Sequence, residues 1–145
     1  KNQRSKTTVN PNLNKHLLTP QNDGRFIDNG DGTVTDKATG LIWQKEDDGK
    51  EKTWEEAFRY SMSLNRGGIK NWRLPTIDEL NTLIDKSYFP KINPIFIATK
   101  TFYWSSSFYN EDSSSAWTIN FCDGFLNRNY KSGHLYVRCV RLEGC

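Results

Sequence analysis

The sequence from Tyr103 to Gly124, YWSSSFYNEDSSSAWTINFCDG, decides the fold that we predict for this chain. It contains two strand-like runs, each with a tryptophan near its start, joined by a polar loop. In the second run Trp117, Ile119 and Phe121 fall on one side, which is the period of two expected of a half-buried strand. The Asp-Gly pair that follows is a turn signal. We therefore expect a small antiparallel sheet in this half of the chain.

A basic segment and a third strand-like run come next. Residues 127–134 contain no acidic residue, and residues 136–142 read YVRCVRL, with the β-branched valines that favour strands. We expect residues 127–134 to form a loop and residues 136–142 to form a strand of the same sheet. The loops of this sheet are expected to carry the function.

Three short strands are expected near the start of the domain. The segments 25–28, 33–36 and 40–44 are strand-like, and Asn-Gly and Asp-Gly turn signals fill residues 29–32. The acidic residues around this loop do not have EF-hand calcium spacing, because Gly30 occupies the third ligand position. The loop is interpreted as a tight turn.

Two helices are expected between these strands and the C-terminal sheet. Thr53 with Glu56 and Thr76 with Glu79 each have the spacing of a capping box. Each helix should present an apolar stripe to the core. The residues of the first stripe are Trp54, Ala57, Phe58 and Met62, and those of the second are Ile77, Leu80, Leu83 and Ile84.

Length and composition favour one extracellular domain with a tail. The chain has 145 residues, a mean hydropathy of −0.77 and an aromatic fraction of 13%, so a few large side chains must supply most of the burial. We expect residues 1–21 to be a flexible lead-in or stalk junction, and residues 22–145 to be a binding domain. No apolar run of about 18 residues occurs, so membrane insertion is not expected.

The three cysteines leave alternatives open. Cys122 and Cys139 flank the basic segment and could form a disulfide if their strands are neighbours, with Cys145 left unpaired. The alternative is three reduced thiols, two of them buried. A zinc site is not expected, because the chain has no Cys-x-x-Cys pair and its histidines, His16 and His134, lie far apart in sequence.

A series of short motifs resembles a known bacterial family. The motifs are DGTVTD at 31–36, TGLIW at 39–43, WEEA at 54–57, WRLPT at 72–76, YWSSS at 103–107, AW at 116–117 and VRCVR at 137–141. In this order they resemble a bacterial domain family that forms the C-terminal domain of certain collagen-like adhesins. The resemblance covers roughly residues 25–141.

This resemblance implies a fold, a function and an assembly. The fold would be an α+β domain of the C-type-lectin-like type, with two amphipathic helices packed on a twisted, loop-rich antiparallel sheet. The function would be that of a non-catalytic extracellular adhesin that binds sulfated or otherwise anionic polysaccharides such as glycosaminoglycans. Its assembly would be a homotrimer at the end of a stalk on the bacterial surface.

Two alternatives accompany this interpretation. The RLPT sequence at 73–76, followed by an acidic helix, is also similar to formylglycine-generating enzymes, which need a copper-binding cysteine pair. A structural trimer tip with protein partners is the other alternative.

The candidate ligand-binding residues are basic and polar side chains of the C-terminal half. Sulfate and carboxylate groups are held by cations and by bidentate hydrogen bonds. Calcium-lectin motifs are absent from the sequence, so we expect no metal or other cofactor. The formal net charge is only +3 and no exposed stacking platform is evident from the sequence, so nucleic acid is not expected as a partner. The expected ligand-binding residues are Arg128, Asn129, Lys131, His134 and Arg138.

Overall fold

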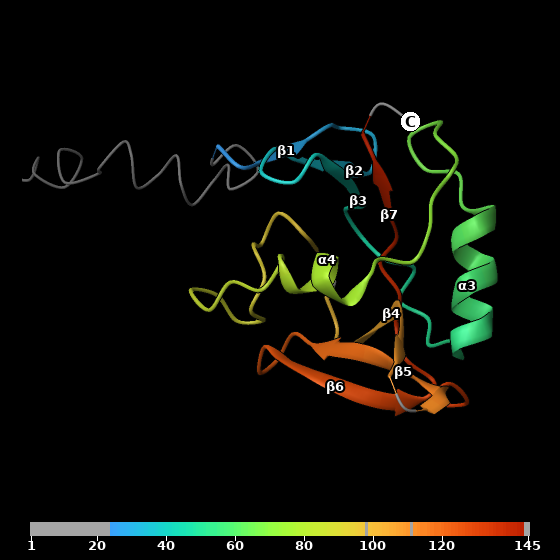
Figure 1. Ribbon diagram of the computed structural model, residues 1–145. Helices are drawn as coiled ribbons and strands as arrows, with labels where there is room; N and C mark the ends of the chain where they lie inside the picture. The colour runs from blue at the N-terminus through green and yellow to red at the C-terminus, as the bar shows by residue number, and fades with distance from the viewer. Residues whose placement is uncertain (1–23, 98, 111, 144–145) are drawn as a thin grey trace, which may run out of the picture.

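The structure is a computed structural model that describes residues 24–97, 99–110 and 112–143. It is a small α+β domain with two antiparallel sheets and two short helices (Figure 1). The predicted lead-in, residues 1–21, lies outside the described residues. The elements in chain order are β1 (Phe26–Asp28), β2 (Thr33–Asp36), β3 (Leu41–Gln44), α3 (Trp54–Ser63), α4 (Ile77–Asn81), β4 (Phe102–Tyr109), β5 (Asp112–Asn120), β6 (Phe125–Tyr130) and β7 (Val140–Leu142).

The expected single sheet is divided into two. One sheet has the strand order β1-β2-β3-β7 and the other has the order β4-β5-β6. The run at 136–142 was predicted to join the sheet of β4 and β5, but its strand part, β7, pairs with β3, with Ile42 opposite Arg141. The three-stranded sheet is completed instead by β6, which pairs with β5 along its whole length. Short runs of valine predict a strand without indicating its partner.

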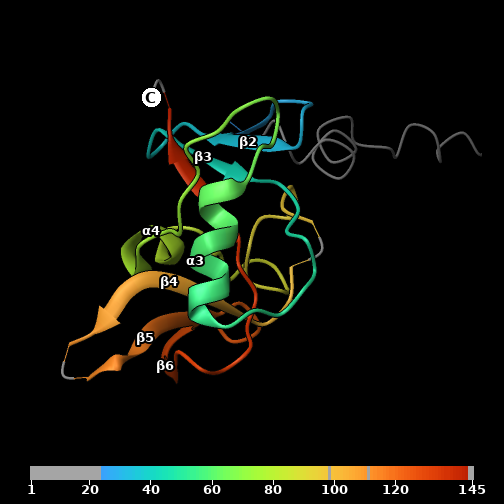
Figure 2. The ribbon, with the colours of Figure 1, turned by 90° about the vertical axis from the view of Figure 1, so that its right-hand side faces the viewer.

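The two sheets lie at opposite ends of the domain, with α4 between them and α3 along one side (Figures 1 and 2). In Figure 2 α3 runs from the β3 end of the molecule to the β4–β5 hairpin. The N-terminal end of α3 therefore lies beside the three-stranded sheet. None of the helices in the described part of the chain is long and apolar enough to cross a membrane.

Both predicted capping boxes are present. The hydroxyl of Thr53 accepts a hydrogen bond from Glu56 N, and the Glu56 carboxylate accepts one from Thr53 N. Thr76 and Glu79 form the same pair of bonds at α4. Each capping box provides acceptors for backbone N–H groups at the start of the helix, which have no intrahelical partner.

The predicted apolar stripe of α3 faces the core only in part, because Ala57 is buried and Trp54 packs against the interior. Ala57 and Ser61 are the buried residues of this helix, whereas Phe58 is 42% exposed and Met62 is 65% exposed. The small side chains of Ala57 and Ser61, one turn apart, let α3 pack closely on the interior, and the larger Phe58 and Met62 lie at the surface. The prediction for α4 holds better, because Leu80 and the following Leu83 are buried.

Two apolar clusters form the interior, and each takes side chains from both sheets. Trp43 of β3 and Tyr103 of β4 belong to the larger cluster, while Ile42 and Trp104 belong to the smaller one. Adjacent residues of a strand point to opposite faces, so β3 and β4 each contribute to both clusters. Trp43, Trp104 and Tyr103 are among the largest fully buried side chains, although aliphatic residues are the more numerous in both clusters.

The possible Cys122–Cys139 disulfide is absent, and both residues are free thiols. Cys139 is fully buried in the smaller cluster, and its backbone N–H donates to the Gln44 side chain at 2.7 Å. Cys122 follows Phe121, which belongs to the larger cluster. The two segments thus pack in different parts of the interior. Burial raises the pKa of the Cys139 thiol above its usual range.

The N-terminal acidic residues serve the turns and an ion pair, as the turn interpretation expects. Asp28 accepts a hydrogen bond from Gly30 N at 2.9 Å, and Asp31 accepts one from Thr33 N at 3.0 Å. Asp36 is fully buried and accepts two hydrogen bonds of 2.9 Å from Arg25. These carboxylates are therefore already engaged by protein donors.

We predict that Asp36→Asn destabilises the domain by about 1–3 kcal/mol at pH 7, because hydrogen bonds to a buried carboxylate are lost. Burial raises the pKa of Asp36, but hydrogen bonds from Arg25, Thr39 and Ala38 outweigh it, so the pKa lies below its usual value. A lowered folded-state pKa contributes stability above the unfolded-state pKa, about 3.9 for aspartate. This stability is lost as the pH falls through the folded-state pKa.

Urea denaturation of the wild type and of Asp36→Asn, at several pH values from 7 to 2.5, measures this effect. The difference between the two free energies of unfolding should be constant above about pH 5 and should shrink at lower pH. Asp123→Asn, at an exposed turn residue, is the control. A difference for Asp36→Asn that stays the same down to pH 2.5 would contradict the prediction.

Candidate functional site

The basic segment that was predicted to be a loop, residues 127–134, is a strand in its first half and a turn in its second. Residues 127–130 belong to β6, an edge strand of the three-stranded sheet, with Trp117 opposite Arg128, and residues 131–134 follow outside the strand. The side chains of β6 are exposed or half-buried throughout, so its sequence lacks the apolar alternation that predicts strands. The Asp123-Gly124 turn, predicted from sequence, brings this segment back along β5.

This strand conformation separates the two cations that were expected to act together. Arg128 lies within β6 and Lys131 in the turn that follows it, and the two cations contact different aromatic rings. The Arg128 guanidinium lies over the Tyr109 ring at 5.1 Å, whereas the Lys131 ammonium lies over the Phe108 ring at 3.8 Å. Tyr109 packs on Trp117 and Phe108 packs on Trp54, so these two neighbours on β4 belong to different surfaces.

We call the first of these surfaces the Arg128 face, which consists of Arg128, Tyr109, Trp117, Tyr130 and Asp112. The guanidinium carbon of Arg128 lies 5.1 Å from the Tyr109 ring centroid and 5.4 Å from that of Tyr130. The Tyr109 and Trp117 rings are in contact, with centroids 5.2 Å apart. Tyr130 is 59% exposed. The face thus combines one cation with a surface of aromatic rings.

The nearest carboxylate in the described chain to Arg128 is that of Asp112, at 3.9 Å. A charge-assisted hydrogen bond between nitrogen and oxygen is about 2.7–2.9 Å long, so this pair is not tightly bonded. Asp112 instead accepts hydrogen bonds from Ser114 and Ser115, and those from Ser114 are the main reason that the pKa of Asp112 is lowered. The side chain of Arg128 is 43% exposed.

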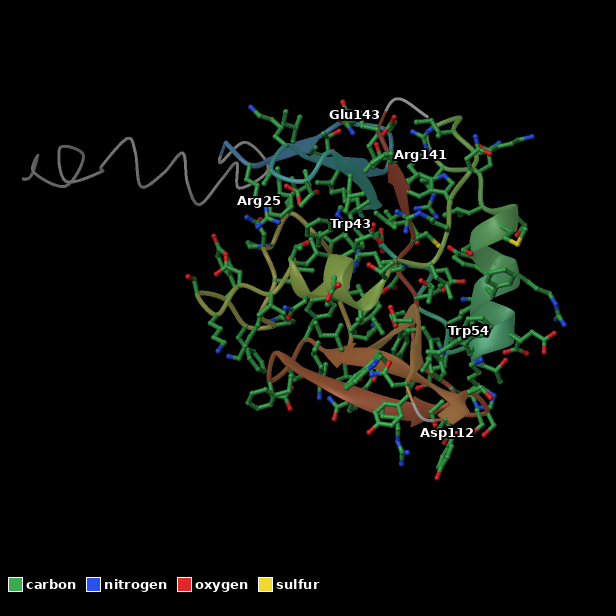
Figure 3. All side chains as sticks on the ribbon, in the orientation of Figure 1. Arg25, Trp43, Trp54, Asp112, Arg141 and Glu143 are labelled. Atoms are coloured by element: carbon green, nitrogen blue, oxygen red, sulfur yellow. The ribbon has the colours of Figure 1, made fainter. Side chains whose placement is uncertain are left out.

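We call the second surface the Lys131 cavity. It has a volume of about 640 Å³, and it is open to solvent beside the N-terminal end of α3. Figure 3 shows Trp54, the first residue of α3, between this helix and the β4–β5 hairpin. The lining residues are Thr53, Trp54, Glu55, Phe58, Lys131 and Ser132.

Main-chain hydrogen bonds hold Lys131 in place at this cavity. Its N–H donates to Ser114 O at 2.9 Å, and its carbonyl accepts from Trp54 N at 3.1 Å. The ammonium lies 4.5 Å from the Trp54 ring centroid and 3.8 Å from that of Phe108. Within the described ranges, Lys131 has no ion pair with a carboxylate, so its charge faces aromatic rings and solvent.

Asn129 and His134 do not belong to the Arg128 face. Asn129 is adjacent to Arg128 on β6 and points to the other face of the strand, where its side-chain oxygen accepts a hydrogen bond from Thr118 Oγ1 at 2.7 Å. His134 is exposed near the capping box of α3. The backbone N–H of Thr53 does most to lower the pKa of the Glu56 carboxyl, and the nearby His134 adds to the effect.

Arg138 was predicted to bind ligand, and the structure corrects this. Its side chain is completely buried and donates hydrogen bonds to backbone carbonyls of Gln44 and Lys45 and to Thr99 Oγ1. It also lies 3.7 Å from the buried carboxylate of Asp47. A guanidinium enclosed in this way cannot reach a ligand at the surface. Arg138 is therefore a structural residue.

The sequence did not reveal the aromatic residues of either surface. Tyr109 and Phe108 belong to a strand whose faces could not be assigned from sequence, because its pairing with β5 contains register shifts. Trp54 and Phe58 were assigned to the core. Their spacing of four residues does indicate one helix face, but it does not say whether that face is buried.

The structure is a small α+β domain in which cations lie against aromatic side chains at two exposed surfaces beside the three-stranded sheet. Two of the sequence motifs reach these surfaces, since Trp54 and Glu55 line the Lys131 cavity and Trp117 belongs to the Arg128 face. The chain belongs to the Lcl C-terminal domain family, whose model matches residues 32–141. No curated protein matches the chain at a significant level of sequence similarity.

Proposed function

We propose that this chain is a non-catalytic extracellular adhesin domain that binds anionic polysaccharide, with a glycosaminoglycan-like sulfated chain as the ligand class. The observation that carries the proposal is the environment of the Arg128 side chain. Its guanidinium lies over the Tyr109 and Tyr130 rings, its side chain is 43% exposed, and Asp112 is its only neighbouring carboxylate in the described chain, at 3.9 Å. The N–H groups of a guanidinium lie in its plane and form a fixed fork of donors. An edge with several N–H donors matches the oxygens of a sulfate or carboxylate group.

The aromatic rings of the Arg128 face support a saccharide rather than a bare anion. A pyranose ring has an apolar C–H surface that can pack on Tyr109, Tyr130 or Trp117 through hydrophobic and dispersion contacts. Tyrosine hydroxyls and indole N–H groups add polar partners at the rim of such a surface. One cation and adjoining rings thus fit a sugar that carries an acidic substituent.

Membership in the Lcl C-terminal domain family supports a surface-associated role. The resemblance to collagen-like adhesins extends the proposal to a C-type-lectin-like variant fold, a location on the bacterial surface or in the medium, and a homotrimer. Three copies would raise avidity for a repeating polymer, because each further contact is made at high effective concentration.

The formylglycine-generating alternative has weaker support. That chemistry needs a reactive cysteine pair, and a reactive thiol is expected to have a lowered pKa and access to solvent. Cys139 is fully buried, and its pKa is raised. The proposal therefore assigns no catalytic residue.

The test is affinity for immobilised heparin, measured by surface plasmon resonance. We predict that Arg128→Gln weakens binding at least about tenfold, since a hydrogen bond to a charged group contributes roughly 1.5–3 kcal/mol. Glutamine removes the charge and keeps a similar stem. Binding by the wild type should also weaken as salt is raised, because salt screens exposed charges.

Arg59→Gln is the matched control, because Arg59 is an exposed arginine of α3 outside the Arg128 face. It removes the same charge and should change the affinity less than about twofold, as expected of an exposed surface charge. Equal losses for Arg59→Gln and Arg128→Gln would indicate binding by net charge alone. That result, or no heparin binding by the wild type, would overturn the proposal.

A further inference from the structure

The Lys131 cavity is a second surface with a different chemistry from the Arg128 face. Its volume of about 640 Å³ lies within the range of about 300–1,000 Å³ typical of small-molecule sites. The two surfaces share no residue, because the cavity is lined by α3 and the turn after β6, whereas Arg128 lies over Tyr109 and Tyr130. The cavity is therefore a separate candidate site.

The cavity has an apolar wall of aromatic rings. The Trp54 and Phe58 rings are nearly parallel, with centroids 5.5 Å apart and planes inclined by 12°. Phe108 meets Trp54 at 5.8 Å and an angle of 53°. Phe58 is 42% exposed, so this wall faces solvent, and the adjacent Phe108, outside the lining, is 53% exposed. Packing the apolar face of a flat molecule on this wall would remove apolar surface from solvent, which is favourable.

Polar groups surround this wall, and their charges are mixed. Lys131 supplies one cation, while Thr53 and Ser132 supply hydroxyl groups. Glu55 also lines the cavity, and its carboxylate pairs with Arg59 at 2.6 Å. A carboxylate accepts hydrogen bonds from the hydroxyl groups of a sugar. Glu55 and the adjacent Glu56 would repel a densely sulfated chain.

We propose that the Lys131 cavity binds a single pyranose ring that carries one carboxylate, as in a uronic acid. In this arrangement the C–H face of the ring packs on Trp54 and Phe58. The carboxylate pairs with the Lys131 ammonium, and the ring hydroxyls bond to Ser132, Thr53 and Glu55. The inference rests on the proposed function only in taking a saccharide as the ligand.

Titration with methyl β-D-glucuronide, followed by ¹H–¹⁵N correlation spectra, tests the assignment. Methyl β-D-glucoside is the matched probe, because it differs only in carrying a hydroxymethyl group in place of the carboxylate. We expect the glucuronide to shift the Trp54 indole N–H and the amides of Thr53 and Ser132. The glucoside should bind at least about tenfold more weakly, because it lacks the charged contact.

Two substitutions separate the parts of the site. Lys131→Met keeps the aliphatic stem and should weaken glucuronide binding about tenfold while leaving glucoside binding unchanged. Phe58→Ala should weaken binding of both sugars, because Phe58 belongs to the wall. Met62→Ala, one turn further along α3 and 65% exposed, should change neither. Loss of glucoside binding in Lys131→Met would overturn the role given to its charge.

Arg128→Gln distinguishes this inference from the proposed function. It should leave glucuronide binding at the cavity unchanged, although it weakens heparin binding. If the wild type binds heparin through Arg128 but shows no shifts at Trp54 with glucuronide, the proposed function stands and this inference fails. If glucuronide shifts Trp54 and heparin does not bind, the cavity assignment stands alone.

Discussion

Replacing Arg138 with methionine should destabilise the domain by about 3–5 kcal/mol, the cost of breaking a buried charged pair on one side. Arg138 donates to the carbonyls of Gln44 and Lys45 at 3.0 and 2.5 Å, and to Thr99 Oγ1 at 2.9 Å. The substitution leaves these acceptors without their donor, and it leaves the buried Asp47 carboxylate without the nearby cation. Urea denaturation at pH 7 measures the loss.

Arg59→Met is the control for this prediction. Arg59 forms an exposed pair with Glu55, four residues earlier on α3, and such pairs contribute about 0.3–0.5 kcal/mol. If Arg138→Met unfolds the protein, Arg138→Lys keeps a charge with fewer donors and should give a smaller, measurable loss. A free energy of unfolding for Arg138→Met within about 0.5 kcal/mol of the wild type would refute the structural role, since that is the size of an ordinary surface substitution.

Replacing Trp104 with alanine should cost about 3–5 kcal/mol, as expected when a large buried aromatic side chain is removed. Trp104 is fully buried, and its indole N–H donates to Lys52 O at 2.8 Å. The indole N–H of Trp54 donates in the other direction, to Ser105 O at 2.9 Å. Together the two tryptophans join the start of α3 to β4. Thermal and urea denaturation measure the loss.

Trp104→Phe and Phe125→Ala complete this test. Trp104→Phe retains an aromatic ring but loses the bond to Lys52, so it should cost less than Trp104→Ala. Phe125 is 63% exposed at the start of β6, and its replacement by alanine should change stability by less than about 1 kcal/mol. Similar losses for Trp104→Ala and Phe125→Ala would contradict the anchoring role of Trp104.

Local features of the fold could be predicted from sequence. The three N-terminal strands lie where alternation and turn residues indicate them, and both capping boxes form. Each of these features depends on residues that are close together in sequence, where spacing carries the physical constraint.

Features that depend on distant parts of the chain could not be predicted in this way. The pairing of β7 with β3 joins residues about a hundred positions apart, and no local pattern encodes it. The burial of Arg138 likewise depends on carbonyl groups of the distant residues Gln44 and Lys45. The formal charge of an arginine says nothing about where its hydrogen-bond acceptors will be.

The candidate site shows the same division. The basic character of residues 127–134 could be predicted, but the strand conformation of residues 127–130 could not, because β6 gains its order from pairing with β5. Arg128 and Lys131 were therefore predicted to belong to one site, although their side chains lie at different surfaces. Tyr109 and Phe58 become candidates only when the neighbouring strands and helix are in place.

The position of β6 as an edge strand has an evolutionary consequence. Side chains alternate along a strand, so inserting or deleting one residue after the turn at Gly124 would transfer Arg128 and Tyr130 to the opposite side in a single step. Substitutions alone would have to exchange these residues one at a time. Length variation in this turn is thus a direct route by which descendants of this sequence could exchange their ligand preferences.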